Sequence, residues 1–402
     1  MALWAMRTVY LLALAQALAA CGIMSVVLLG GILGATMAPT PGLATLAPTL
    51  AIVGLAIATI PAALAMQRWG RKPVMIGAAL FASLASLLAG WGVAHGEFAL
   101  LCLGCCGVGM HNAIVQQYRF AATEWVPPEA AGRAVSTIML GTLAAVFLSR
   151  QAALWSEHWW PGHPHAGSFL SLALLFLATA SLLLWLPSQA PAHAAVAADT
   201  SPLRSLRELT AQPALRVAVA GSIVAWVVMS FIMTATPVSM HNVDGHDFAA
   251  TTNVIQFHLL AMFIPALFGG WVLAQLGIRR MMLGGSAAMA LCIAIATVGG
   301  HDVLHYTWAL VLLGIGWNWL FVASTALLTT TYRPAERFRV QALNEFITFG
   351  AQAASSLFAG AALFSYGWQW LNLLMLPLLV LMVGVSWSIP LKPAHRDGHA
   401  PR

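Results

Sequence analysis

The sequence predicts an all-α membrane protein with twelve transmembrane helices in two six-helix bundles and both termini on the cytoplasmic side. Three observations support this class: the composition, the placement of the basic residues, and a repeat between the two halves. Of the 402 residues, 60% are hydrophobic and only 7% are charged. A soluble domain carries about 25% charged residues, so this chain lacks the side chains to cover a water-facing surface.

Twelve apolar stretches are long enough to cross a bilayer, which takes about 20 residues for each helix. In the first half we expect helices at 9–35, 44–66, 73–94, 98–120, 133–155 and 166–186. In the second half we expect them at 214–240, 248–274, 280–299, 305–331, 339–365 and 367–389. The chain is thus divided into an N-terminal bundle (1–186), a cytoplasmic linker (187–213), a C-terminal bundle (214–390) and a cytoplasmic tail (391–402).

The basic residues set the orientation. Of the 18 Lys and Arg residues, all but Arg150 fall at one face of this topology. Loops rich in Lys and Arg stay in the cytoplasm, which predicts a multi-pass protein of the bacterial inner membrane. The net charge of +6 therefore indicates cytoplasmic loops rather than a nucleic-acid partner. Many of the 13 histidines fall in the opposite loops, either as a surface that gathers metal ions or as ordinary polar loop residues.

A repeat with an offset of about 207 residues relates the two halves. Gly70-Arg71-Lys72 matches Gly277-Ile278-Arg279, and Gly107-Val108-Gly109 matches Gly314-Ile315-Gly316. Arg133 and Arg339 occupy the corresponding place before the fifth and eleventh predicted helices. The same landmarks in the same order indicate two duplicated bundles.

The loop after the second predicted helix carries a family resemblance. Gln67-Arg68-Trp69-Gly70-Arg71-Lys72 is similar to the D-R-x-G-R-[RK] loop of the major facilitator superfamily, with Gln67 in place of the usual Asp. The resemblance implies a central cavity between the halves and alternating access by rocking of one half against the other. No Walker-type phosphate loop and no nucleophile–base arrangement is found, so we expect neither an ATPase nor any other enzyme.

Two pairs of soft side chains lie within predicted helices. Met229 and Met233 share one helical face, as do His258 and Met262 on the next helix. Thioether and imidazole ligands select monovalent copper over hard cations. A methionine pair can equally be flexible packing. The spacing resembles the paired MxxxM and HxxxM signature of CcoA-type copper importers.

That resemblance implies a secondary transporter that imports copper, as Cu(I), to supply haem-copper oxidase assembly. Copper would be the transported substrate, with no cofactor. The partners would be the lipid bilayer and a cytoplasmic copper chaperone, and the protein would be a monomer. Residues for an outer uptake path are Met240, His241 and His246. Candidates for gating or coupling are Arg71, Arg119, Arg133, Arg150 and Glu345, with Glu345 placed to meet Arg133 or Arg339.

Two alternatives remain open from the sequence. Riboflavin transporters are related to the same subgroup, and an aromatic metabolite of that kind could stack on Trp317 or Trp319 of the tenth predicted helix. The default interpretation of these Trp residues is packing or interfacial anchoring. The second alternative is a membrane copper sensor that binds the ion without transporting it.

Overall fold

The computed structural model describes residues 2–126, 131–187, 204–333 and 336–389, and throughout these ranges the chain forms helices without any strand. Ten of the helices are long and apolar enough to cross a membrane. The predicted tail (391–402) and most of the predicted linker (188–203) lie outside the described residues. What the linker does show is a short helix, α8 (Leu206–Ala211), which begins with a capping box formed by Ser205 and Glu208.

Helices α1 to α7 form the first half of the molecule. Their bounds are α1 (Ala2–Met37), η1 (Pro41–Leu43, a 3-10 turn), α2 (Leu46–Trp69), α3 (Arg71–His95), α4 (Phe98–Val115), α5 (Tyr118–Glu124), α6 (Ala131–Ser156) and α7 (Ala166–Leu183). The stretch predicted as one helix at 98–120 is divided, because the chain turns at Gln116 and Gln117 before α5 begins.

The second half follows α8. Its bounds are α9 (Pro213–Pro237), η3 (Val238–Val243, a π-helical turn), α10 (Phe248–Val298), α11 (Val303–Thr329), α12 (Arg337–Leu373) and α13 (Leu376–Trp387). Pro237 cannot donate a backbone hydrogen bond, and the α-helical pattern changes to the wider π turn directly after it.

The count of ten spans differs from the twelve that the sequence predicts, and glycine explains the difference. Helix α10 runs for 51 residues but is interrupted at Gly277, where φ is 74°. Helix α12 is interrupted in the same way at Gly367, where φ is 79°. Helix α10 therefore covers two of the predicted stretches, and α12 covers one and the start of the next, which ends with α13; each pair of stretches meets at one glycine instead of a loop. A positive φ is readily available only to glycine.

The repeat recognised in the sequence has a conformational counterpart. Gly70 between α2 and α3 has φ 83° and ψ 162°, and Gly277, 207 residues later, has φ 74° and ψ 165°. Glycines also allow the closest helix contacts at related positions. A Cβ on Gly109 would lie 1.9 Å from the carbonyl oxygen of Ala51, and one on Gly316, its counterpart in the repeat, would lie 2.8 Å from that of Gly285.

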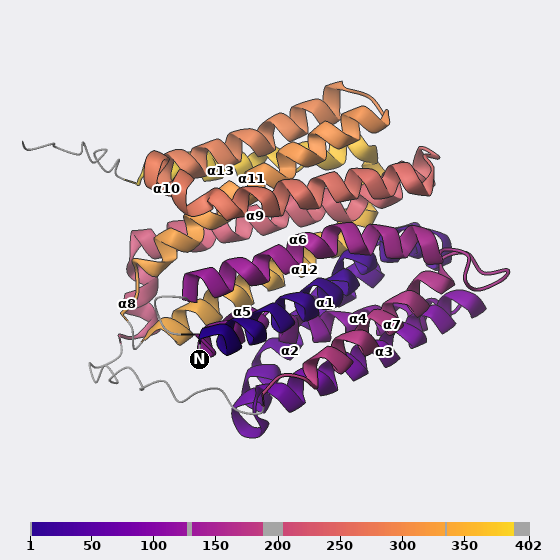
Figure 1. The fold of residues 1–402 in the computed structure, drawn as a ribbon. Coiled ribbons are helices and arrows are strands. Elements are labelled where there is room, and N and C mark those ends of the chain that lie inside the picture. The colour runs from indigo at the N-terminus through magenta and orange to yellow at the C-terminus, as the bar shows by residue number, and fades with distance from the viewer. Residues whose placement is uncertain (1, 127–130, 188–203, 334–335, 390–402) are drawn as a thin grey trace, which may run out of the picture.

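The helices form two packed groups that lie side by side along their length (Figure 1). In the first group α1 packs on α6 and α4, and in the second α9 packs on α11 and α12. Contacts between the groups run mainly through α2 with α12 and through α6 with α10. The start of α1 lies at the same end of the molecule as α8, as an even number of crossings before the linker requires.

The two halves are joined at the end opposite α8. Among the described residues, the hydrogen bonds between halves all lie there. Thr49 donates to Ser356 Oγ at 2.9 Å, Thr45 Oγ1 accepts from the backbone N–H of Gly360 at 3.2 Å, and Asn242 donates to the carbonyl of Ile32 at 3.4 Å. The same end carries a ring contact between His165 and Phe248, with centroids 4.7 Å apart. These contacts close the molecule at the end opposite α8, which is the outer end in the predicted orientation.

Candidate substrate site between the halves

Four aromatic rings from three helices of the second half form a cluster, which we call the aromatic cluster: Trp226, Trp317, Phe321 and Phe349. The Trp226 ring meets Trp317 edge-on at 4.9 Å between centroids, and it meets Phe321 and Phe349 at 5.7 Å. Trp317 and Phe321 stack at 5.2 Å with only 12° between their planes. Edge-on and offset contacts of this kind are the favourable geometries for aromatic pairs.

The aromatic cluster lies at mid-depth and borders the interface between the halves. Trp226 is the fourteenth of the 25 residues of α9, and Trp317 is the fifteenth of the 27 residues of α11. Phe349 on α12 packs against a hydrophobic core cluster of the first half, which includes Leu12 and Tyr118. Substrate sites of secondary transporters lie near the bilayer midplane between the halves.

The two Trp residues considered from the sequence have different surroundings. Trp317 belongs to the aromatic cluster and is 6% exposed. Trp319 instead covers Gly284 of α10, where an added Cβ would lie 2.8 Å from its ring. Trp226 and Phe349 were not singled out in the sequence, since single aromatic residues in apolar helices carry no signal until the packing of the helices is known.

Polar side chains lie directly beside the aromatic cluster. Gln352 donates from Nε2 to Ser230 Oγ at 2.9 Å, and Ser355 donates to the carbonyl of Val227 at 2.9 Å, so both bonds join α12 to α9. Several buried polar atoms have no hydrogen-bond partner within the described residues, among them Gln352 Oε1 and Trp317 Nε1. Buried polar atoms are nearly always paired, so atoms left free beside a candidate site are free to bind a ligand.

The predicted copper ligands are all buried. His258 is fully buried, and its Nδ1 lies 2.8 Å from the carbonyl oxygen of Leu310, while its Nε2 has no partner among the described residues. Met229, Met233 and Met262 are each 5% exposed. A ring nitrogen fixed by a backbone carbonyl leaves the other nitrogen available, which is the usual arrangement of a metal-ligating histidine.

The helices that carry the two pairs do not pack closely on each other. Helix α9 packs on α11 and α12, whereas α10 packs mainly on α11, so that α11 is the neighbour that both share. His258 and Met262 contact α11 directly: Asn318 donates to the carbonyl of Met262 at 3.0 Å. The close approach of the two pairs to one ion stays a prediction.

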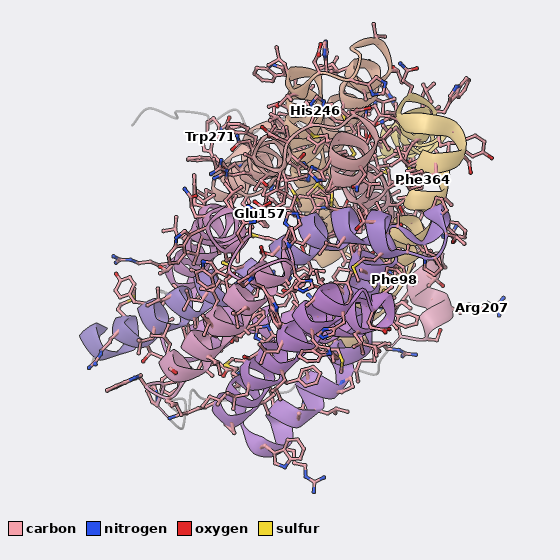
Figure 2. All side chains as sticks on the ribbon, turned by 90° about the vertical axis from the view of Figure 1, so that its right-hand side faces the viewer. Phe98, Glu157, Arg207, His246, Trp271 and Phe364 are labelled. Carbon is pink, nitrogen blue, oxygen red and sulfur yellow. The ribbon has the colours of Figure 1, made fainter. Side chains whose placement is uncertain are left out.

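The predicted outer uptake path is occupied by structural hydrogen bonds. His241 Nδ1 lies 2.9 Å from the carbonyl oxygen of His246, whose own Nε2 lies 2.7 Å from that of His301. Met240 is fully buried. In the ranges that the structure describes, no group of three or more His, Cys, Asp or Glu side chains could hold a metal ion. Figure 2, which views the molecule from the end opposite α8, shows where His246 lies.

Two of the five predicted gating or coupling residues have defined polar partners. Arg71 binds Glu124 with both ends of its guanidinium, and the Nε to Oε2 distance is 2.8 Å. Glu124, at the end of α5, therefore supplies an acidic partner to Arg71 at the loop where Gln67 replaces the usual Asp. Arg150 donates to Asn253 Oδ1 at 2.7 Å and so links α6 of the first half to α10 of the second.

For the other three (Arg119, Arg133 and Glu345) a gating or coupling role stays a prediction. Glu345 was expected to meet Arg133 or Arg339, but the charge that acts on Glu345 is that of Arg119. Arg339 instead reaches the carbonyl of Arg204 at 3.4 Å, and Arg133 is exposed. The Arg119 guanidinium lies over the Phe120 ring at 4.9 Å. Arg119 lies on the short helix α5, and Glu345 lies near the start of α12.

Comparison with known proteins identifies the family. A model of the Major Facilitator Superfamily matches residues 12–265 and 246–402. The chain therefore belongs to the major facilitator superfamily, and it is a multi-pass membrane carrier rather than an enzyme.

Relatives cover nearly the whole chain. The riboflavin transporter RfnT of Brucella anthropi is 37% identical over 393 residues, which is 97% of each chain. The uncharacterized MFS-type transporter YdeG of Bacillus subtilis is 26% identical and covers 95% of this chain and 92% of its own. The resemblance to CcoA-type copper importers gains no support from these relatives.

Solved structures show the same fold. A bacterial homolog of the human lysosomal transporter Spinster gives a TM-score of 0.75 at 14% identity and covers 96% of both chains. The nucleoside transporter NupG gives a TM-score of 0.73 at 12% identity and covers 95% of this chain and 99% of its own. At these identities the likeness concerns the fold alone.

Proposed function

We propose that this carrier takes up riboflavin, or a closely similar flat aromatic heterocycle, across the bacterial inner membrane by alternating access. The observation that carries the proposal is the aromatic cluster at mid-depth, which borders the interface between the halves. In this proposal the tricyclic flavin ring stacks on Trp226 and Trp317. Stacking on aromatic side chains contributes about 1–3 kcal/mol for a nucleic-acid base, and a flavin presents a larger surface.

The riboflavin transporter of Brucella anthropi supports the same assignment, because its similarity extends over 97% of both chains. Among the expectations drawn from the sequence, the organic-molecule alternative is thus better supported than copper import. The neutral character of the site agrees with this substrate class. The aromatic cluster is bordered by amides and hydroxyls such as those of Gln352 and Ser230, which suit an uncharged polar heterocycle.

Uptake of labelled riboflavin by a bacterial strain that cannot synthesise it tests the proposal. We expect uptake in cells that express the protein, and a loss of about tenfold or more in Trp226→Ala and Trp317→Ala. Trp271→Ala is the matched control, because Trp271 is 69% exposed at the surface of α10 and should leave uptake unchanged (Figure 2). Uptake no higher than in cells without the protein would overturn the assignment.

Copper import is a second candidate, and the free Nε2 of buried His258 is the observation that favours it. A variant with Met229, Met233 and Met262 replaced by Leu and His258 by Gln separates the two candidates. If riboflavin is the substrate, this variant keeps riboflavin uptake. Cells that express the variant then contain the same amount of copper as cells without it. If copper is the substrate, copper accumulation depends on the four side chains and riboflavin uptake is absent.

A further inference from the structure

Two hydrogen-bonding atoms of opposite character border the aromatic cluster and lack partners within the described residues. Gln352 is 6% exposed, and because its Nε2 donates to Ser230, its Oε1 remains as a free acceptor. Trp317 is also 6% exposed, and its indole N–H remains as a free donor. Leaving a buried polar atom without a partner is unfavourable, so both atoms favour a ligand that satisfies them.

The two atoms belong to the same small region. Ser230, which holds Gln352, follows Trp226 by one helical turn on α9, and Gln352 follows Phe349 by three residues on α12. The Trp226 ring in turn contacts both Phe349 and Trp317. Both side chains are therefore linked to Trp226: Trp317 by direct ring contact, and Gln352 through Ser230 on the same helix.

We infer that the site recognises its substrate through a cyclic amide edge, an N–H next to a C=O within a planar ring. The substrate N–H donates to Gln352 Oε1, and the adjacent carbonyl oxygen accepts from the Trp317 indole N–H. This inference rests on the proposed function and deepens it. Riboflavin carries such an edge on its pyrimidine ring, where one N–H lies between two carbonyls, whereas the dimethylbenzene end of the same molecule has none.

Riboflavin methylated at that ring nitrogen (N3-methylriboflavin) is the sharpest probe, because it keeps the ring system and the sugar chain and loses only the N–H. In wild-type protein we expect its KM to be about tenfold higher than that of riboflavin, as a site built to bind a donor rejects an analogue without it. Gln352→Met removes the acceptor at similar volume. It should raise the KM of riboflavin about tenfold and leave that of the methyl analogue unchanged, so that the two values converge.

Matched controls exist on the same helices. Gln341→Met makes the same replacement on α12, three turns closer to α8, where Gln341 donates to the hydroxyl of Tyr332 at 2.8 Å. Trp317→Phe removes the indole N–H and keeps a ring, and Trp319→Phe makes the same change where the ring covers Gly284. Only Gln352→Met and Trp317→Phe should raise the KM of riboflavin.

The outcomes separate this inference from the proposed function. If wild-type cells do not take up riboflavin, the proposed function is wrong. If they take up riboflavin and its N3-methyl analogue with equal KM, the function holds and the amide-edge inference is wrong. That comparison uses the wild-type protein alone, so it remains decisive even if Gln352→Met fails to reach the membrane.

Discussion

Arg204 and Glu336 form an ion pair that fastens the segment before α9 to the loop between α11 and α12. The Nη2 to Oε2 distance is 2.6 Å, and the backbone N–H of Arg204 donates to Glu336 Oε1 at 3.0 Å. The backbone N–H of Arg333 also donates to this carboxylate, whose side chain is only 1% exposed. Three groups thus bind one buried anion, and a further bond runs from Arg204 to the carbonyl of Thr331.

Replacing Arg204 tests the contribution of this ion pair to stability. The Arg204 guanidinium, followed by the N–H of Arg333, holds the pKa of Glu336 well below its usual range. The pair therefore stabilises the folded state fully above the pKa of an unfolded Glu, about 4.3, and loses its effect as the pH falls below it. We expect Arg204→Gln to lower the melting temperature of the purified protein at pH 7, with the difference from wild type narrowing below about pH 4. Arg207→Gln, on an exposed side chain of α8, is the control. Equal melting curves at pH 7 would show that the ion pair is dispensable.

The hydrogen bonds between α2 and α12 should bias the molecule toward the state that is closed at the end opposite α8. Thr45→Val with Thr49→Val removes three of the bonds between halves, because Thr45 Oγ1 also donates to the carbonyl of Leu357 at 3.4 Å. Each bond contributes about 1 kcal/mol, so the pair of substitutions should shift the equilibrium toward opening by tenfold or more. Spin labels at the exposed residues Thr40 and Tyr366 report this shift as a larger population at long distance. Thr59→Val, within α2 but bonded to its own helix, should leave the distances unchanged.

Acid should weaken the same closure through His165. Burial, followed by the nearby His241 and His158, lowers the pKa of His165 to about 4, and the carboxylate of Glu157 at 3.8 Å does not offset this. The closed state holds His165 neutral, whereas in the open state the exposed side chain has the ordinary histidine pKa of about 6.5. The closed state therefore loses stability as the pH falls from about 6.5 to 4. We expect the same spin-label pair to show more opening at pH 5 than at pH 7.5.

The His165 effect can be isolated by one substitution. His165 has φ 66°, the left-handed region that Asn tolerates, so His165→Asn changes the titrating group without adding backbone strain. The pH response should be smaller in His165→Asn and unchanged in His163→Asn, on an exposed neighbour. A full response in His165→Asn would assign it to another group.

Close helix packing in the first half depends on Gly109. An added Cβ would lie 1.9 Å from the carbonyl oxygen of Ala51, so α4 and α2 must separate in Gly109→Ala. Overpacking of this kind costs about 1–3 kcal/mol, which should appear as a lower melting temperature and less protein in the membrane. Gly77→Ala on α3, where an added Cβ meets nothing within 4 Å, should be neutral or slightly stabilising.

Composition was enough to predict a helical membrane protein, because a chain with so few charges has no alternative to lipid. The number of separate helices was less accessible. Gly277 was placed in a loop and Gly367 at the start of the last predicted helix, although a single glycine at positive φ is enough to interrupt each of these two helices. Gln116 and Gln117 gave no sign of the break between α4 and α5, since Gln is a good helix former.

The site was only partly accessible from the sequence. Met229, Met233, His258 and Met262 were noticed because soft side chains in regular spacing are unusual in a membrane helix. Trp226 and Phe349 could not be noticed in the same way, because aromatic residues are common in apolar helices. Their importance follows from the packing of α9 against α11 and α12, which depends on contacts more than 80 residues apart.

The glycine junctions at Gly70 and Gly277 also bear on how the protein moves. Each joins the ends of two membrane-crossing helices through one residue, with no loop between them. The helix ends joined at such a glycine stay within one residue of each other. Each pair of joined helices is therefore expected to move together when the carrier changes conformation. The two glycine junctions therefore favour rotation of whole helix pairs and disfavour sliding of single helices along their axes.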